Sequence, residues 1–132
     1  TCIVQTTGNP WGHLILRGGR NRPNYCKEFV DAAAISLKLN KLPPNVVVDC
    51  SHDNASKDYR KQPEVWRNVV DQRVLGNRNI VGLMLESFIG EGNQPLTQDL
   101  SKLAYGVSIT DPCIGWETTA ELIRWASDTL KK

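Results

Sequence analysis

The sequence has no long hydrophobic run, no secretory signal at its start and no Cys-x-x-Cys pair among its 4 cysteines. Its apolar stretches are far shorter than the roughly 20 residues that cross a membrane, so we expect a soluble chain with no membrane partner. Without paired cysteines or a signal, a reduced, cytoplasmic setting is expected. Charge of one sign is not in excess either: 16 Lys and Arg face 14 Asp and Glu, spread along the chain. Nucleic acid is therefore not an expected partner.

The length of 132 residues suits one ordinary domain. A compact fold of this size buries roughly two-thirds of the surface of its unfolded chain. We expect a single unit over 1–132 with no internal boundary. The chain starts inside an apolar segment, "TCIVQTT", without an initiator Met, as a fragment of a longer protein would.

Periodicity predicts alternating strands and helices. Two short β-type runs, 2–6 and 13–17, are separated by a Gly-Asn-Pro turn signal and suggest a hairpin or a strand entry. Apolar residues that recur every three or four positions predict helices, and Thr118 with Glu121 suggests a capping box at the start of the last helix. The expected helices cover 25–39, 64–75 and about 117–130, and the later strands cover 46–49 and 80–86.

The order of these elements predicts an α/β fold with parallel strands. The strand at 46–49 reads "VVVD", apolar at consecutive positions, which is typical of strands buried on both faces. Repeated β-α units form either an open doubly wound sheet or part of a (β/α)8 barrel. Because a closed barrel needs eight units, about three units would leave two sheet edges unpaired.

Polar chemistry follows each predicted strand at its carboxyl end. Arg17 ends the first strand, Asp49 and His52 follow the second, Glu86 ends the third, and Asp111 lies in the loop beyond. The carboxyl ends of barrel strands are where such folds place their active sites. These residues are therefore expected to share one site.

Three of these residues have the donor atoms of a metal site. His52, Glu86 and Asp111 supply one nitrogen and two carboxylates, which suit Mn²⁺, Fe²⁺, Co²⁺ or Zn²⁺. Each also has a simpler interpretation: a hydrogen-bonded loop histidine, a carboxylate paired with a Lys or Arg, and a turn residue before a proline. Arg17, beside two glycines, suits a phosphate or carboxylate ligand, or else is a surface residue of a tight turn.

Several motifs together resemble a known family. The segments "ILRGG", "VVVDCSHDNASK", "VGLMLES", "EGNQPL" and "LAYGVSITDPCIGWE" look like the carboxyl-terminal part of type I 3-deoxy-D-arabino-heptulosonate 7-phosphate (DAHP) synthase. The resemblance implies a partial (β/α)8 TIM barrel, equivalent to strands six to eight with their helices. It also implies a transferase that condenses phosphoenolpyruvate with erythrose 4-phosphate in the first step of the shikimate pathway to chorismate and the aromatic amino acids. Such enzymes need a divalent metal and no organic cofactor.

The resemblance assigns roles to individual residues. It makes His52, Glu86 and Asp111 three of four metal ligands, the fourth being a cysteine on a strand that this chain does not contain. It places Arg17 on the phosphate of phosphoenolpyruvate and Asp111 beside erythrose 4-phosphate, so that Asp111 also acts in catalysis. Asp49 is expected to support His52 or the substrate in catalysis.

Two further expectations come from the resemblance. Val4 lies in the predicted hairpin, which resembles a region that binds an aromatic amino acid in feedback-regulated members, and is an allosteric candidate. The family's Lys-Pro-Arg-Thr segment and its other basic substrate ligands are missing from this chain. We therefore expect the isolated chain to be inactive. The unpaired sheet edges separately predict that the chain forms a homo-oligomer.

Two alternatives remain open from sequence. The chain resembles, less closely, 3-deoxy-D-manno-octulosonate 8-phosphate synthase, which has the same metal-site logic. It would otherwise be a non-catalytic module that binds a ligand or regulates another protein, in which case it should bind without metal.

Overall fold

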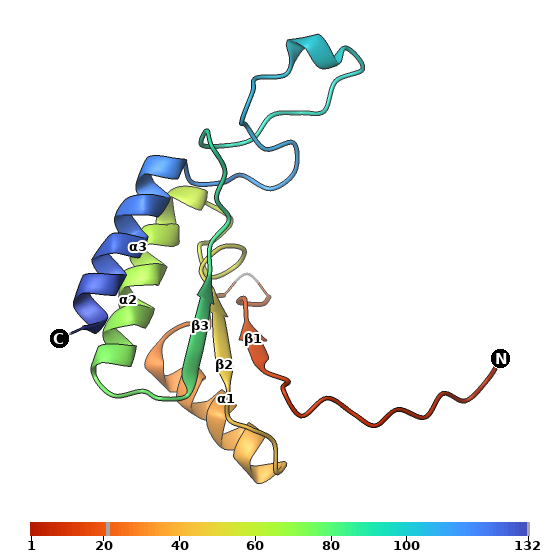
Figure 1. Ribbon diagram of the computed structural model, residues 1–132, viewed down its shortest axis with the longest axis vertical. Coiled ribbons are helices and arrows are strands. Elements are labelled where there is room, and N and C mark those ends of the chain that lie inside the picture. The colour runs from red at the N-terminus through yellow and green to blue at the C-terminus, as the bar shows by residue number, and fades with distance from the viewer. Residues whose placement is uncertain (21, 132) are drawn as a thin grey trace.

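The structure is a computed structural model that describes residues 1–20 and 22–131. Three parallel strands form one sheet in chain order, and helices connect or follow them (Figure 1). The strands are β1 (Leu14–Leu16), β2 (Val46–Asp49) and β3 (Ile80–Met84). The helices are α1 (Lys27–Leu39), α2 (Gln62–Val74) and α3 (Trp116–Leu130), with two short 3-10 helices, η1 (Tyr59–Lys61) and η2 (Leu100–Lys102). The predicted α/β arrangement of parallel strands and helices is confirmed.

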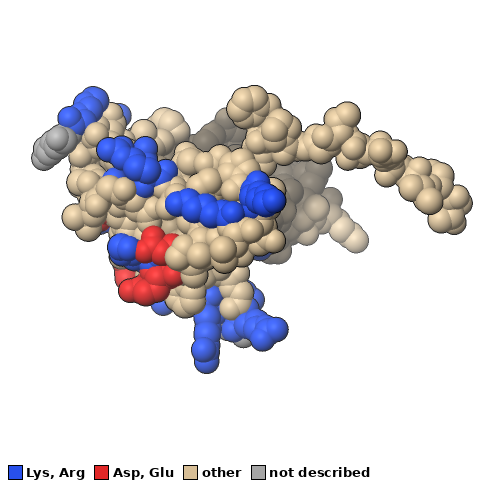
Figure 2. Space-filling view, turned by 90° about the horizontal axis from the view of Figure 1, so that it is seen from below, with Lys and Arg blue, Asp and Glu red and all other residues tan. Residues whose placement is uncertain are grey.

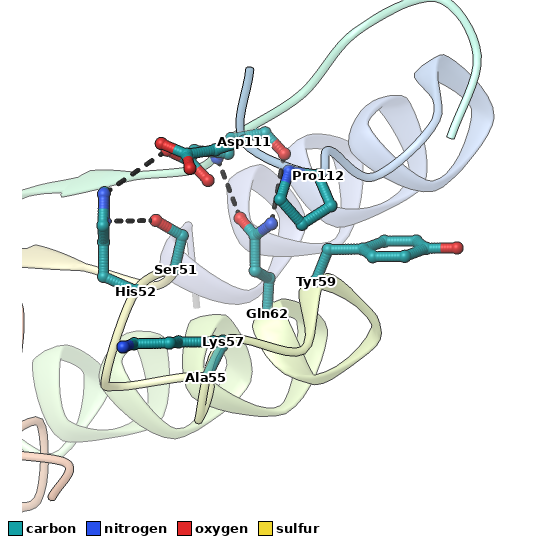
Figure 3. Close-up of a pocket in the computed structure, with 9 residues that line it drawn as sticks. Ser51, His52, Ala55, Lys57, Tyr59, Gln62, Asp111 and Pro112 are labelled. Carbon is teal, nitrogen blue, oxygen red and sulfur yellow. Dashed lines mark hydrogen bonds and ion pairs between the residues drawn. The ribbon is translucent and has the colours of Figure 1, made fainter. Parts of the chain in front are cut away.

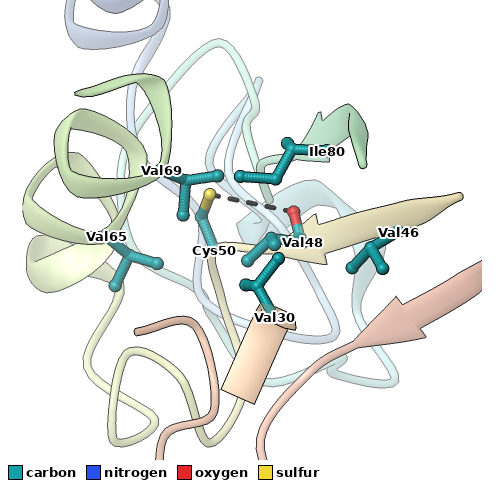
Figure 4. Packing of buried hydrophobic residues seen from close by; sticks show 7 residues of the cluster. All are labelled: Val30, Val46, Val48, Cys50, Val65, Val69 and Ile80. Carbon is teal, nitrogen blue, oxygen red and sulfur yellow. Dashed lines mark hydrogen bonds between the residues drawn. The ribbon is translucent and has the colours of Figure 1, made fainter. Parts of the chain in front are cut away.

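The core lies between the central strand and the first two helices. Val46 and Val48 point to the same face of β2, where they pack with Val30 of α1 and with Val65 and Val69 of α2 (Figure 4). All five are buried. Full burial of an aliphatic side chain contributes roughly 1.5–3 kcal/mol, so this cluster holds the helices against the sheet.

The opposite face of the sheet is only partly covered. Val47 lies between the two buried valines of β2 and is half-buried, and its partner on β1, Ile15, is 52% exposed. β2 is the central strand, so among the described residues the outer edges of β1 and β3 have no neighbouring strand. The sheet is therefore open on one face and at two edges.

The long segment after β3 leaves the sheet and returns to it. It projects away from the carboxyl ends of the strands (Figure 1). Gln94 closes the excursion, because its side-chain amide donates to Ala104 and Val107 carbonyls and accepts from the Ala104 N–H. The Ile114 N–H then donates to the Glu86 carbonyl at 2.9 Å, which brings the segment back beside the end of β3.

Some predicted boundaries differ from the structure. The hairpin is wrong: residues 2–6 form no strand in the described chain, and Val4 is 75% exposed. The capping box is also wrong, because α3 begins one turn earlier with Gly115 as its N-cap and no side-chain cap. α2 begins at Gln62 rather than 64, with a proline in its first turn, and β3 ends at Met84 rather than 86.

Surface charge shows no single dense patch on the face at the amino ends of the strands. Figure 2 shows Lys and Arg dispersed over that face with a few acidic side chains between them. Across the described part of the chain, none of the helices is both long enough and apolar enough to cross a membrane.

Candidate metal centre

The end of β2 holds a histidine in a fixed orientation. Asp49, the last residue of the strand, is 3% exposed, and its Oδ1 accepts the Ser51 N–H and the Ser51 hydroxyl, both at 2.8 Å. Its other oxygen, Oδ2, lies 2.7 Å from Nδ1 of His52. The backbone of His52 has φ of 48°, a left-handed conformation that costs free energy outside glycine. The carboxylate of Asp49 therefore anchors a strained turn that carries the histidine.

This bond also selects the histidine tautomer. The Ser51 hydroxyl lies 2.7 Å from Nδ1 as well, but it donates to Asp49, whose carboxylate can only accept. Nδ1 therefore carries the proton that it donates to Asp49, and in the neutral imidazole this leaves the lone pair on Nε2. A histidine that donates one ring nitrogen to a carboxylate is typical of metal sites.

Glu86 faces this lone pair from the end of the neighbouring strand. Its Oε1 lies 3.5 Å from Nε2 of His52. The backbone of Glu86 is held on both sides by the side chain of Gln62, which accepts the Glu86 N–H at 2.8 Å and donates to the Glu86 carbonyl at 3.2 Å. The Glu86 side chain therefore extends toward His52 from main chain that two hydrogen bonds to Gln62 hold in place.

The surroundings of Glu86 disfavour the ionised form of its carboxyl group. Burial raises the pKa of the Glu86 carboxyl, His52 opposes this shift, and the carboxylates of Asp111 and Asp49 raise the pKa further. Three carboxylates and one imidazole therefore lie close together without a Lys or Arg ion pair to Glu86 in the described chain. A cation would relieve the repulsion.

Asp111 completes a set of three metal donors. The ligand atoms of His52, Glu86 and Asp111 all lie within 4.8 Å of one another. Bonds of about 2.0–2.2 Å to one ion place two ligands no more than roughly 4.4 Å apart, so small side-chain rotations bring all three into range. The donor set therefore fits a divalent ion. The pocket around it, of about 370 Å³, is lined by Ser51, His52, Ala55, Lys57, Tyr59, Gln62, Glu86, Asp111 and Pro112 (Figure 3).

Arg17 lies at the same edge of the sheet but outside this pocket lining. It directly follows β1 and its side chain is exposed. The turn that carries it packs tightly against the histidine loop, because a Cβ on Gly18 would lie 2.6 Å from Cβ of Asp53. The structure therefore brings together four of the predicted site residues, with Arg17 nearby. It leaves Val4 in the exposed amino-terminal segment.

A buried amide that sequence reasoning missed links the Arg17 turn to the histidine loop. Asn54 is buried, and its Nδ2 donates to the carbonyls of Leu16 at 3.0 Å and Asp49 at 2.8 Å. Its Oδ1 accepts the Asn24 N–H at 2.7 Å. Asn54 and Gln62 gave no periodic signal in the sequence; the only hint was that two amide side chains follow the histidine turn.

Comparisons with known proteins identify the family of this chain. Residues 1–124 match the model of the DAHP synthetase I family. A Tyr-sensitive phospho-2-dehydro-3-deoxyheptonate aldolase from Escherichia coli K12 is 52% identical over 122 residues, which cover 92% of this chain and 34% of that protein. A Tyr-sensitive relative from Enterobacter agglomerans is 50% identical over 123 residues, which cover 93% of this chain and 57% of that protein.

A solved structure has the same arrangement of strands and helices. The phospho-2-dehydro-3-deoxyheptonate aldolase from Francisella tularensis SCHU S4 superposes with a TM-score of 0.89 at 37% identity. The match covers 96% of this chain and 36% of that one. This chain therefore spans about a third of the length of most relatives named here, and little more than half of the shortest.

Proposed function

This chain belongs to the DAHP synthetase I family, and from that premise we propose that it forms part of a metal-dependent transferase. The proposed reaction condenses phosphoenolpyruvate with erythrose 4-phosphate and consumes one water molecule to give DAHP and phosphate, the first step of aromatic amino acid biosynthesis. The names of the relatives favour this reaction over that of 3-deoxy-D-manno-octulosonate 8-phosphate synthase. We further propose that 1–132 is one incomplete portion of a barrel domain, equivalent to strands six to eight.

The observation that carries this proposal is the convergence of three donors from separate segments. His52 follows β2, Glu86 follows β3, and Asp111 comes from the segment that returns to the sheet, yet their ligand atoms lie within 4.8 Å. We propose these three as ligands of a divalent ion, Mn²⁺, Fe²⁺, Co²⁺ or Zn²⁺. Such an ion supplies a Lewis acid for the aldehyde of erythrose 4-phosphate.

The other residues take supporting roles in this proposal. Asp49 keeps His52 in the tautomer that presents Nε2 to the ion. Arg17 binds the phosphate of phosphoenolpyruvate, because its guanidinium is exposed at the same sheet edge and can hold an anion in register. Asp111, the most exposed of the three donors, also faces the aldehyde substrate. Val4 is proposed as part of an aromatic amino acid site that other parts of the protein complete.

Metal binding to the 132-residue chain tests the proposed ligands. We expect His52→Ala to weaken Mn²⁺ binding by about tenfold or more, because the imidazole is a direct ligand. Electron paramagnetic resonance of free Mn²⁺ during a titration gives the affinity. His13→Ala is the matched control, because His13 is exposed at the other end of β1 and should leave the affinity unchanged. Equal losses in both variants would contradict the assignment.

Activity of the isolated chain is a separate prediction. We expect no turnover with both substrates and Mn²⁺, because the family's fourth ligand and its other basic substrate residues are outside this chain. A phosphate-release assay measures this directly. Turnover comparable to that of a full-length relative would show that these residues are dispensable.

A further inference from the structure

Gln62 has an environment that its position in the sequence does not suggest. It is the first residue of α2, yet it is 0% exposed. Both polar atoms of its side chain bond to the backbone of Glu86, 24 residues away. Figure 3 shows the Gln62 side chain reaching up from the helix toward the segment that carries the candidate ligands.

The amide of Gln62 continues the pairing of β3 after the neighbouring strand has ended. The last bond between the two strands runs from the Cys50 N–H to the Met84 carbonyl at 2.9 Å. Two residues later, the Glu86 N–H and carbonyl are bonded by a side-chain amide, which has the same donor and acceptor as a peptide group. An apolar side chain in this place would leave the Glu86 N–H without that partner.

We infer that Gln62 is a positioning residue for the metal centre. These two hydrogen bonds hold the two peptide groups that flank the Cα of Glu86. They therefore fix the direction in which the Glu86 side chain leaves the main chain. That direction brings Oε1 of Glu86 to 3.5 Å from Nε2 of His52. The inference rests on the proposed function, because it assigns Gln62 a role toward the ion that His52, Glu86 and Asp111 bind.

The expected effect is on metal affinity rather than on folding alone. Residues that orient metal ligands typically change affinity by about 10–100-fold when they are replaced. Gln62→Met keeps the length and most of the volume of the side chain but removes both bonds to Glu86. We therefore expect Mn²⁺ binding to weaken by about tenfold or more. The absorption spectrum of bound Co²⁺ should also change, because it reports the geometry of the ligands.

Gln72 offers a matched control in the same helix. It is also buried, and its Nε2 donates to the Tyr25 carbonyl and to Oδ1 of Asn68, both at 2.8 Å. None of these groups belongs to the metal centre. Gln62→Met and Gln72→Met should lower the thermal unfolding midpoint by similar amounts. Only Gln72→Met should leave the Mn²⁺ affinity and the Co²⁺ spectrum unchanged.

The outcomes separate this inference from the proposed function. Equal loss of affinity in Gln62→Met and Gln72→Met, or no loss in either, overturns the positioning role. If the wild-type chain itself binds no Mn²⁺, the proposed metal centre fails and the inference fails with it.

A measurement on the wild-type chain covers the case in which Gln62→Met does not fold. Hydrogen exchange followed by nuclear magnetic resonance reports whether the Glu86 N–H is held without metal. We expect this amide to exchange about 100-fold more slowly than those of the exposed excursion near Leu96. Exchange as fast as at Leu96 would overturn the inference.

Discussion

At the scale of single residues, the site depends as much on amides as on titratable groups. The convergence of His52, Glu86 and Asp111 was predictable because side chains at the ends of successive parallel strands gather at one edge of the sheet. Asn54 and Gln62 were not, because their partners lie up to 38 residues away and no periodicity marks such pairs. The sequence therefore predicts the donors of the site but not the residues that hold them.

The turn after Arg17 leads to a prediction at this scale. Gly18 has φ of 76°, and a Cβ there would lie 2.6 Å from Cβ of Asp53. We expect Gly18→Ala to lower the free energy of unfolding by roughly 2–4 kcal/mol, because it combines a left-handed backbone with overpacking. Denaturant unfolding followed by circular dichroism measures the change.

A second glycine provides the control for this prediction. Gly8 has a similar φ of 78°, but a Cβ there would meet nothing within 4 Å. Gly8→Ala lies in the exposed amino-terminal segment and should change the free energy of unfolding by less than about 1 kcal/mol. Similar losses at both positions would mean that backbone strain, and not the close approach to Asp53, decides the effect.

At the scale of elements, the last helix packs on its neighbour rather than on the sheet. The Trp66 indole N–H of α2 donates to the Leu122 carbonyl of α3 at 3.2 Å, and Leu122 is 1% exposed. Figure 1 shows the two helices side by side. The attachment of α3 to the rest of the chain therefore depends on this helix pair.

Truncation of Leu122 tests that attachment. Leu122→Ala should lower the free energy of unfolding by about 2–5 kcal/mol, because it leaves a cavity between α2 and α3. Ile123→Ala removes a neighbouring aliphatic side chain that is 50% exposed and should cost less than about 1 kcal/mol. Equal costs, measured by chemical unfolding, would show that the helix pair is not packed as described.

Helices and strands were predicted correctly where the residue pattern of a single segment reflects how that segment packs. α1 was found because its buried face recurs every three or four residues, and β2 because both of its faces are apolar. The strand predicted at 2–6 fails for a nonlocal reason. Its apolar residues suit a strand, but a strand needs a partner, and Ile3 contacts none of the core described here.

At the scale of the whole molecule, the sheet presents an apolar face and two unpaired edges among the described residues. We expect the isolated chain to self-associate with increasing concentration, because such edges pair with other strands. Light scattering gives the average mass. Ile15→Lys places a charge on the open face of β1 and should shift the chain toward monomer.

The control for this prediction lies on a helix. Ile35 of α1 is exposed to a similar degree, so Ile35→Lys changes the charge equally without touching the sheet. Association that persists in Ile15→Lys but is lost in Ile35→Lys would assign the contact to the helices. A wild-type chain that stays monomeric at moderate concentration would contradict self-association altogether.

The hydrogen bonds made by the side-chain amides of Asn54 and Gln62 have a consequence for assembly. Each of these hydrogen bonds has its partner within these 132 residues, so the edge that carries the candidate ligands takes its shape from contacts inside this chain. We therefore expect a split enzyme of this family, divided just before residue 1, to regain its site by complementation. The two parts would dock as preorganised surfaces, and the entropy of ordering the histidine and glutamate would already have been lost before they meet.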